Sequence, residues 1–200
     1  VQDLSSQLCC QALDVRPGMR VLDACSAPGG KTFTLAEQME NQGEVVACDL
    51  YPARVGLIQS GAERLGLDIV HPRVMDASAP DEGIGTFDRV LCDVPCSGLG
   101  IIRRKPELKY KPVAEFEGLP GVQYGILTAC ARLVKPGGVL VYSTCTLNRK
   151  ENEEVIRRFL GEHPEFEPYA VTKDGGFFRT LLPETDGSDG FFFSAVRRIS

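Results

Sequence analysis

The chain has 200 residues, of which 43% are hydrophobic and 24% are charged. This length predicts about one domain with a substantial core. The composition excludes a disordered tail, a collagen-like repeat and a coiled coil. No apolar run approaches the ~18 residues of a membrane span, so no membrane partner is expected. The opening VQDLSSQLCC lacks the basic start, apolar stretch and cleavage site of a signal peptide.

The formal net charge is −5. Whole-chain charge therefore argues mildly against nucleic-acid binding, unless basic residues cluster or another domain contributes, because neutralising phosphates drives that binding. The eight cysteines form no C-x-x-C pair, and the two histidines lie far apart. No metal site, zinc included, is expected from this spacing. We interpret the chain as cytoplasmic with reduced thiols, some of them small core residues.

Short β-rich runs alternate with helical stretches along the chain. In chain order, the predicted elements are a helix over 2–13, a strand over 20–25, a helix over 31–39, a strand over 44–50, a helix over 52–65, strands over 68–76 and 87–93, a helix over 119–134, a strand over 138–145, a helix over 150–161 and a strand over 190–198. Glu151, Glu153 and Glu154 fall in the first turn of the helix over 150–161, where the helix dipole favours acids. Residues 166–189, rich in Gly, Asp and Thr, are expected to form loops at the last edge of the sheet.

Apolar strands that alternate with helices predict a parallel sheet covered on both faces. Pro72 indicates an edge position for the strand over 68–76. The predicted fold is a doubly wound, Rossmann-like α/β domain. Ligands of such sheets bind at the carboxyl ends of the strands. The residues just past each strand are therefore the candidates for a site.

The turn CSAPGGKT follows the first predicted strand. Its two glycines let the backbone approach a ligand, and the helix after it offers free N–H groups. Cys25 replaces the first glycine of a Walker loop, Pro28 crowds the loop, and G-x-G-x-x-G is absent, which disfavours an NTPase and a nicotinamide enzyme. The candidate cofactor-binding residues of this turn are Cys25, Ser26, Ala27, Pro28, Gly29, Gly30 and Lys31.

An acidic residue follows or ends each of the next three strands: Asp49, Asp76 and Asp93. Asp49 lies about 20 residues past the glycine-rich turn, where an acid commonly accepts the ribose hydroxyls. Three carboxylates suit a nucleoside that carries a positive charge and an amino group, and suit a triphosphate poorly. The alternative is a tight turn with carboxylates that cap helices. The repetition of acids favours a nucleoside-type cofactor.

Two cysteines, Cys96 and Cys145, lie shortly beyond strand ends, in DVPCSGLGIIRRKPE and YSTCTLNRKENE. If these strands are neighbours, both thiols open into one crevice. The dipole of the helix expected near Arg149 would favour a thiolate at Cys145. The alternatives are buried structural thiols or a disulfide between them. We favour a functional pair.

Two thiols beside a methyl donor suit one reaction in particular. Carbon 5 of a pyrimidine is a poor nucleophile, but a thiolate that adds to carbon 6 gives an enamine whose carbon 5 attacks an electrophilic methyl group. A second group can then assist release of the thiolate. Asp93 could hold the ring by hydrogen bonds. Lys31 could do the same or neutralise charge, and its alternative is a solvated residue at the start of a helix.

The segments LDACSAPGGKT, ACDL, FDRVLCDVPCSG, IIRRKPE, LVKPGG and YSTCTLNRKENE carry a resemblance to a known family. With them the chain resembles the RNA cytosine-5 methyltransferases of the Sun/RsmB type, and among these the bacterial enzymes for small-subunit ribosomal RNA. The likeness spans essentially the whole chain. It implies a class I S-adenosylmethionine-dependent methyltransferase fold, with a mostly parallel seven-stranded sheet, one antiparallel strand and helices on both faces.

The resemblance also implies roles for the candidate residues. It assigns the turn from Cys25 to Lys31 to the cofactor, Asp49 to its ribose and Asp76 to its adenine. It makes Asp93 the acid of the family's fourth motif, Cys145 the nucleophile and Cys96 the cysteine that helps release the product. Spacing alone does not rank the two thiols.

The chain departs from the family pattern in three places. Ser26 and Val94 each replace a usual Ala, and KPELKY, which ends in Tyr110, stands where a His/Asn-Pro-Asp stretch with Trp is common. None of these changes removes a reacting group, although Tyr110 puts an RNA contact in doubt.

The implied partner is RNA, ribosomal RNA above all. Family members usually carry an N-terminal RNA-binding region, so residues 1–200 are expected to be the catalytic domain in the C-terminal part of a longer protein. A local basic stretch beside the active-site loop could follow a phosphate backbone, or could be a solvated loop. It comprises Arg103, Arg104, Lys105, Lys109 and Lys111.

The leading hypothesis is an enzyme that makes 5-methylcytosine in RNA, with a target base that is flipped out or unpaired. A non-catalytic RNA-binding or assembly module that binds the cofactor is one alternative. The other is a methyltransferase for another substrate, which would not require Cys145.

Overall fold

The computed structural model describes residues 2–200, apart from the side chains of Glu82 and Val113. In chain order its helices and strands are α1 (Leu4–Ala12), β1 (Arg20–Asp23), α2 (Gly30–Gln38), β2 (Glu44–Asp49), α3 (Pro52–Leu65), β3 (Val70–Val74), β4 (Phe87–Asp93), α4 (Leu119–Ala131), β5 (Val134–Thr144), α5 (Glu153–Glu162), β6 (Phe166–Tyr169), β7 (Phe178–Leu181), α6 (Pro183–Asp186) and β8 (Phe191–Arg198). Between β4 and α4 lie three 3₁₀ helices: η2 (Leu99–Ile101), η3 (Pro106–Tyr110) and η4 (Val113–Glu115).

All strands belong to one mixed sheet in the order β3-β2-β1-β4-β5-β8-β6, with β7 also paired to β8. Strands β1 to β5 run parallel, and β8 is antiparallel to each of its neighbours. Strands β6 and β7 share one edge of β8, because β6 pairs with 195–198 and β7 pairs with 191–194. Together they fill the seventh position. The predicted methyltransferase-type α/β fold is confirmed, and β3 lies at the edge indicated by Pro72.

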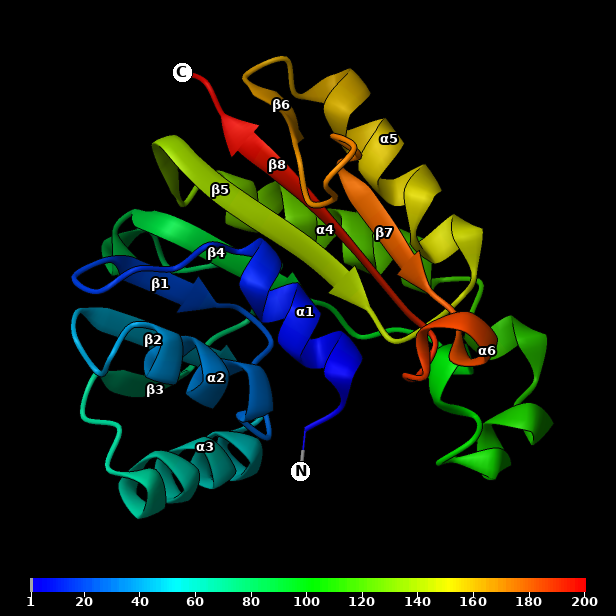
Figure 1. The fold of residues 1–200 in the computed structure, drawn as a ribbon, viewed down its shortest axis with the longest axis horizontal. Helices are drawn as coiled ribbons and strands as arrows, with labels where there is room; N and C mark the ends of the chain where they lie inside the picture. The colour runs from blue at the N-terminus through cyan, green and yellow to red at the C-terminus, as the bar shows by residue number, and fades with distance from the viewer. Residues whose placement is uncertain (1) are drawn as a thin grey trace.

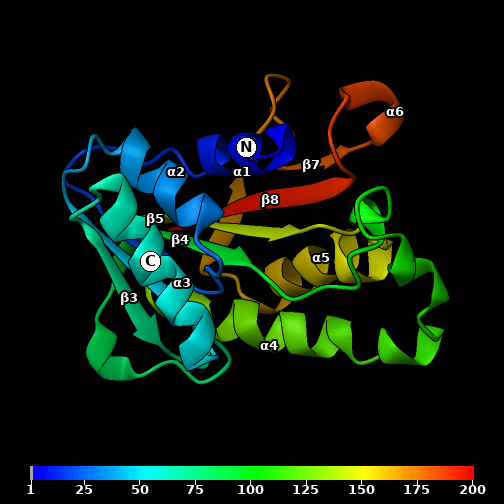
Figure 2. The ribbon, with the colours of Figure 1, turned by 90° about the horizontal axis from the view of Figure 1, so that it is seen from below.

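Helices cover both faces of the sheet (Figures 1 and 2). One core cluster joins α1, α2 and α3 to the sheet through Cys9, Leu35 and Ile58. The other joins α4 and α5 to it through Leu127 and Phe159. Because both faces are buried, the central strands read as continuous apolar runs. Within residues 2–200, no helix combines the length and the apolar composition that a membrane span requires.

The expectation that residues 166–189 form only loops is wrong. This segment contains β6, β7 and the short helix α6. Each strand has only four residues, and each is held by pairing with β8, a partner that follows later in the chain. Phe166 and Leu181 bury their side chains there. Tertiary pairing therefore outweighs the weak local signal.

The helix predicted over 150–161 is interrupted. Residues Arg149–Glu151 form a 3₁₀ turn, η5, and α5 begins only at Glu153. Between them, the side chain of Asn152 accepts from Thr144 Oγ1 at 2.6 Å and donates to the carbonyl of Thr146 at 2.9 Å. Glu153 and Glu154 lie in the first turn of α5, as predicted, whereas Glu151 lies in η5 and is fully buried.

Candidate active site

The carboxyl ends of β4 and β5 bring two cysteines together. The two strands are parallel neighbours, with Asp93 opposite Ser143. Cys96 follows β4 in the next loop, and Cys145 comes directly after β5. Their Sγ atoms lie 3.2 Å apart. The structure therefore places both thiols in one crevice.

The two thiols line a cavity of about 290 Å³. Its other walls come from the loop after Cys96 and from the segment that leads into α4, including Ile101, Lys105 and Phe116. All eight cysteines are free thiols, and five of them are buried in the core. Cys96 and Cys145 are only partly buried, so a ligand in this cavity can reach them.

The hydrogen bond between the two thiols makes them chemically different. The Cys96 thiol as donor lowers the pKa of Cys145, although burial acts in the opposite direction. The same hydrogen bond, together with burial, raises the pKa of Cys96 well above its ordinary value. These directions make Cys145 the more readily ionised of the two thiols. The helix expected to favour a thiolate at Cys145 begins farther away, at Glu153.

A partly buried ion pair lies beside the thiols. Lys31 Nζ is 2.7 Å from Asp93 Oδ2, and Ser143 Oγ donates to Asp93 Oδ1 at 2.7 Å. Burial acts to lower the pKa of Lys31, but the charge and hydrogen bond of Asp93, together with neighbouring groups, raise it above its ordinary value. The Lys31 side chain is only 13% exposed, so it is not a solvated residue at a helix start.

A second cavity, of about 190 Å³, opens at the glycine-rich turn. Ser26 anchors the turn, because its N–H and its hydroxyl both donate to the carbonyl of Cys48. Of the predicted cofactor residues, the cavity is lined by Cys25, Ser26, Ala27, Pro28, Gly30, Lys31 and Asp93.

Three predicted cofactor residues lie outside this cavity. Gly29 has φ 109°, and a Cβ there would meet the Phe33 ring at 2.4 Å, so the turn itself requires glycine. Asp49 is buried and pairs with Arg54 at 3.2 Å. Asp76 is exposed and accepts from the backbone N–H and hydroxyl of Ser78.

Asp23 lines the same cavity and was missed by the sequence reasoning. It is fully buried, and Thr32 donates to its Oδ2 at 2.6 Å. Among the described atoms its Oδ1 has no hydrogen-bond partner. Burial raises the pKa of Asp23 to about 7. Its position at the end of β1 was the available signal, since ligands bind at strand ends.

An unpaired buried carboxylate oxygen is costly, and a ligand that donates to it would remove that cost. The ammonium group of S-adenosylmethionine is such a donor. The residues of this cavity therefore fit the cofactor that the resemblance implies.

The basic stretch is divided between two roles. Arg103 and Arg104 pair with Asp189 at 2.9 and 2.8 Å, and Arg104 also pairs with Asp3 at 2.6 Å. These two arginines thus tie the loop after β4 to the rest of the domain.

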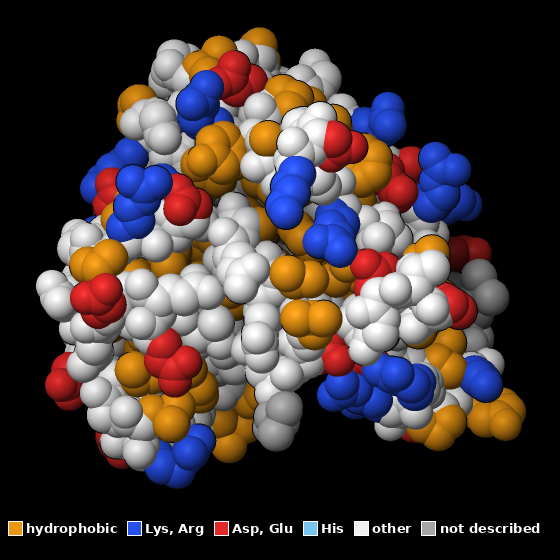
Figure 3. Space-filling view, viewed as in Figure 1, with side chains coloured by type: hydrophobic (Ala, Val, Ile, Leu, Met, Phe, Trp, Pro, Cys, Tyr) orange, Lys and Arg blue, Asp and Glu red, His pale blue; other side chains and the backbone are white. Residues whose placement is uncertain are grey.

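The lysines of the stretch remain available for a ligand. Lys105 and Lys111 line the thiol cavity, and none of the ion pairs within 2–200 involves Lys105 or Lys109. Lys111 lies 3.5 Å from the exposed Glu115. Figure 3 shows Lys and Arg side chains gathered at the lower right, where the segment after β4 projects in Figure 1.

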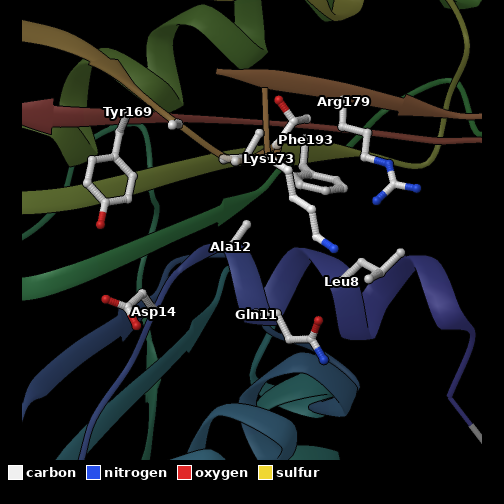
Figure 4. Close-up of a pocket in the computed structure, with 11 residues that line it drawn as sticks. Leu8, Gln11, Ala12, Asp14, Tyr169, Lys173, Arg179 and Phe193 are labelled. Atoms are coloured by element: carbon white, nitrogen blue, oxygen red, sulfur yellow. The ribbon is translucent and has the colours of Figure 1, made fainter. Parts of the chain in front are cut away.

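A cavity larger than either of these two lies elsewhere. This cavity of about 490 Å³ lies between α1 and the β6–β7 connection. Figure 4 shows residues that line it, among them Leu8, Lys173 and Phe193. None of the predicted catalytic or cofactor-binding residues lines this cavity, so the volume of a cavity alone does not identify the candidate site.

Comparison with solved structures gives a match over the whole fold. The chain is similar to the crystal structure of NSun6 from Pyrococcus horikoshii with SFG, with 29% sequence identity and a TM-score of 0.89. That match covers 100% of this chain and 53% of the other.

Two curated proteins that are similar to this chain carry the same name. The chain is 46% identical over 213 aligned residues to the Bacillus subtilis protein named "Probable ribosomal RNA small subunit methyltransferase B", covering 99% of this chain and 47% of the relative. A Synechocystis protein of the same name is 40% identical, again covering 99% and 47%. The chain thus spans about half the length of these relatives.

A family model described as "16S rRNA methyltransferase RsmB/F" matches residues 10–197. This match takes in strands β1 to β7, all of β8 except its last residue, both thiols and the glycine-rich turn. The chain therefore belongs to the RsmB/F family of 16S rRNA methyltransferases.

Proposed function

We propose that residues 1–200 are a catalytic domain that methylates carbon 5 of cytosine in RNA, with small-subunit ribosomal RNA as the substrate and S-adenosylmethionine as the methyl donor. The observation that carries the proposal is the pair of Cys96 and Cys145, 3.2 Å apart in one cavity. A methyltransferase for nitrogen or for a small molecule has no use for such a pair.

The cofactor is assigned to the cavity at the glycine-rich turn. When bound there, it would supply an electrophilic methyl group. Asp23 would accept hydrogen bonds from its ammonium group, and Ala27 and Gly30 line the site. Asp49 is proposed for the ribose and Asp76 for the adenine, at the ends of the neighbouring strands β2 and β3. The binding of an analogue, SFG, by a similar structure supports this cofactor.

Cys145 is the proposed nucleophile. Its thiolate adds to carbon 6 of the cytosine, the ring double bond shifts, and carbon 5 gains the electron density that methylation requires. Asp93 is proposed to hold the base by hydrogen bonds to its ring nitrogen or amine. Lys31 keeps the Asp93 side chain in place through their 2.7 Å ion pair.

Cys96 is proposed to assist release of the product. When the proton on carbon 5 is transferred to a water molecule that enters the cavity, the electrons of the C5–H bond re-form the ring double bond and the electron pair of the carbon–sulfur bond returns to Cys145. The Cys96 thiol, 3.2 Å away, is placed to stabilise the departing thiolate by its hydrogen bond.

The test is methyl transfer from labelled S-adenosylmethionine to small-subunit ribosomal RNA, followed by digestion to nucleosides. The proposal predicts label in 5-methylcytidine, and no label with the Cys145→Ala variant. Label on a nitrogen, on a ribose or on a small molecule would contradict it. Cofactor binding without any transfer would instead indicate the non-catalytic module.

A further inference from the structure

Glu151 is a fully buried carboxylate between the two cysteine loops. Its Oε2 accepts from the backbone N–H of Ser97 and from Gln123 Nε2, each at 2.9 Å. Its Oε1 accepts from Asn148 Nδ2 at 2.9 Å. All of these partners are donors, so the site suits a group that only accepts hydrogen bonds.

These hydrogen bonds connect the residues next to each thiol. Ser97 follows Cys96 and Thr146 follows Cys145, and their hydroxyl oxygens lie 2.8 Å apart. Gln123 of α4 also donates to the carbonyl of Pro95 at 2.9 Å. The loop around Cys96 is thus held on both sides of the cysteine, and Glu151 is the acceptor that joins it to the segment after Cys145.

A carboxylate is a poor choice if this position serves stability alone. Removing a charge from water is costly, and well-packed apolar residues often stabilise a core as well or better. Charge-assisted hydrogen bonds do, however, fix geometry closely, since they are short and directional. The two thiols need loops that are held in fixed positions, because their hydrogen bond depends on a distance of 3.2 Å between sulfur atoms from two different loops.

We propose that Glu151 is a positioning residue that holds the loop from Pro95 to Ser97 so that the Cys96 thiol donates its hydrogen bond to Cys145. Its relevance to methylation rests on the proposed function, but the positioning itself exists without RNA or cofactor. It is therefore tested on the free chain.

The experiment measures alkylation of Cys145 by iodoacetamide as a function of pH, with mass spectrometry to resolve each cysteine. Glu151→Gln keeps the size of the side chain but replaces one acceptor oxygen by an NH₂ group. That group faces either the donors Ser97 and Gln123 or the donor Asn148, so at least one of these hydrogen bonds is lost. We expect the Cys145 profile to move to higher pH, with about tenfold slower alkylation at neutral pH, the effect of losing one hydrogen bond to a charged group. Glu154→Gln, which neutralises an exposed acid nearby, is the matched control and should leave the profile unchanged.

A second background separates positioning from general stability. Cys96→Ala removes the donor itself, so adding Glu151→Gln to it should shift the Cys145 profile no further. An equal shift with and without Cys96 would overturn the proposal, as would an unchanged profile for Glu151→Gln alone. If Glu151→Gln does not fold, Gln123→Met tests the same connection and should move the profile in the same direction; an unchanged profile there also overturns it.

The outcome is independent of the proposed function. If the chain does not transfer methyl groups to RNA, the alkylation profiles are still expected to shift as described. If Glu151 does not position the Cys96 loop, the unaltered chain is still expected to transfer methyl groups.

Discussion

The Sγ atoms of Cys96 and Cys145 lie 3.2 Å apart, although the two residues are separated by 49 positions in the sequence. The adjacent parallel strands β4 and β5 produce this proximity, since both end at the same edge of the sheet. The resulting hydrogen bond lowers the pKa of Cys145 and raises that of Cys96, in the same order as the roles that the family resemblance implies.

Cys96→Ala is predicted to change two rates. The pKa of Cys145 should rise because its donor is lost, so adduct formation with RNA should shift to higher pH. Release should slow as well. At a pH above the shifted pKa only the second effect remains, and a covalent complex with RNA should accumulate. Gel analysis of denatured reactions across pH measures both effects; turnover at the normal rate without any complex would rule out the role of Cys96.

Asp23→Asn is predicted to change how stability depends on pH. The pKa of Asp23 lies at about 7 in the folded chain, above its ordinary value of 3.8. The folded chain therefore keeps a proton that the unfolded chain loses, and the free energy of unfolding falls as pH rises between these values. The fall is about 1.4 kcal/mol per pH unit from this group. Urea unfolding at several pH values should show a flatter dependence for Asp23→Asn.

The same variant should bind S-adenosylmethionine more weakly. Losing a hydrogen bond to a charged group costs about 2 kcal/mol, which corresponds to roughly thirtyfold in affinity by calorimetry. If Asp23→Asn binds S-adenosylmethionine as tightly as the unaltered chain does, Asp23 does not contact the cofactor.

The lysines of the segment after β4 are predicted to contact RNA phosphates. Replacing Lys105, Lys109 and Lys111 by Gln should reduce the salt dependence of RNA binding, by about 0.7 in log–log slope for each lost contact with single-stranded RNA. Arg103→Gln is the comparison, because Arg103 is already paired with the buried Asp189. It should lower stability by about 1 kcal/mol and leave the slope unchanged. An unchanged slope for the lysine variant would place RNA elsewhere.

Gly100→Ala is predicted to disturb the Cys145 loop. Gly100 N–H donates to the carbonyl of Cys145 at 3.0 Å, and a Cβ at Gly100 would meet the carbonyl oxygen of Gly190 at 1.9 Å. We expect a loss of about 1–3 kcal/mol in stability, as for overpacked sites, and a larger loss of methyl transfer than of cofactor affinity. Gly121→Ala, whose Cβ meets nothing within 4 Å, should affect neither activity nor cofactor binding. Equal activity of the two variants would contradict this prediction.

The strands that carry the site were predictable because buried parallel strands are apolar along their whole length. Once β4 and β5 were recognised, sheet geometry placed Asp93, Cys96 and Cys145 at one edge. The short strands β6 and β7 were not predictable, since pairing with β8 rather than local sequence holds them.

The burial of Glu151 and the ion pair of Arg104 with a distant residue could not be predicted from the sequence either. Glu151 has the pattern of an acid in a first helical turn, but its surroundings make it a buried acceptor. Arg104 belongs to a basic run, but Asp3, 101 positions away, pairs with it. Neither contact leaves a local signal in the chain, because both depend on which loops the fold brings together.

In the proposed mechanism the Sγ atom of Cys145 bonds to the base. Covalent trapping tests this bond most directly. Incubation with S-adenosylmethionine and RNA that contains 5-fluorocytosine should give a stable complex, since fluorine cannot leave carbon 5 as a proton does. Peptide mapping of that complex should place the nucleotide on Cys145, and Cys145→Ala should abolish it. A nucleotide on Cys96, or no complex with an RNA that the chain does methylate, would contradict the account.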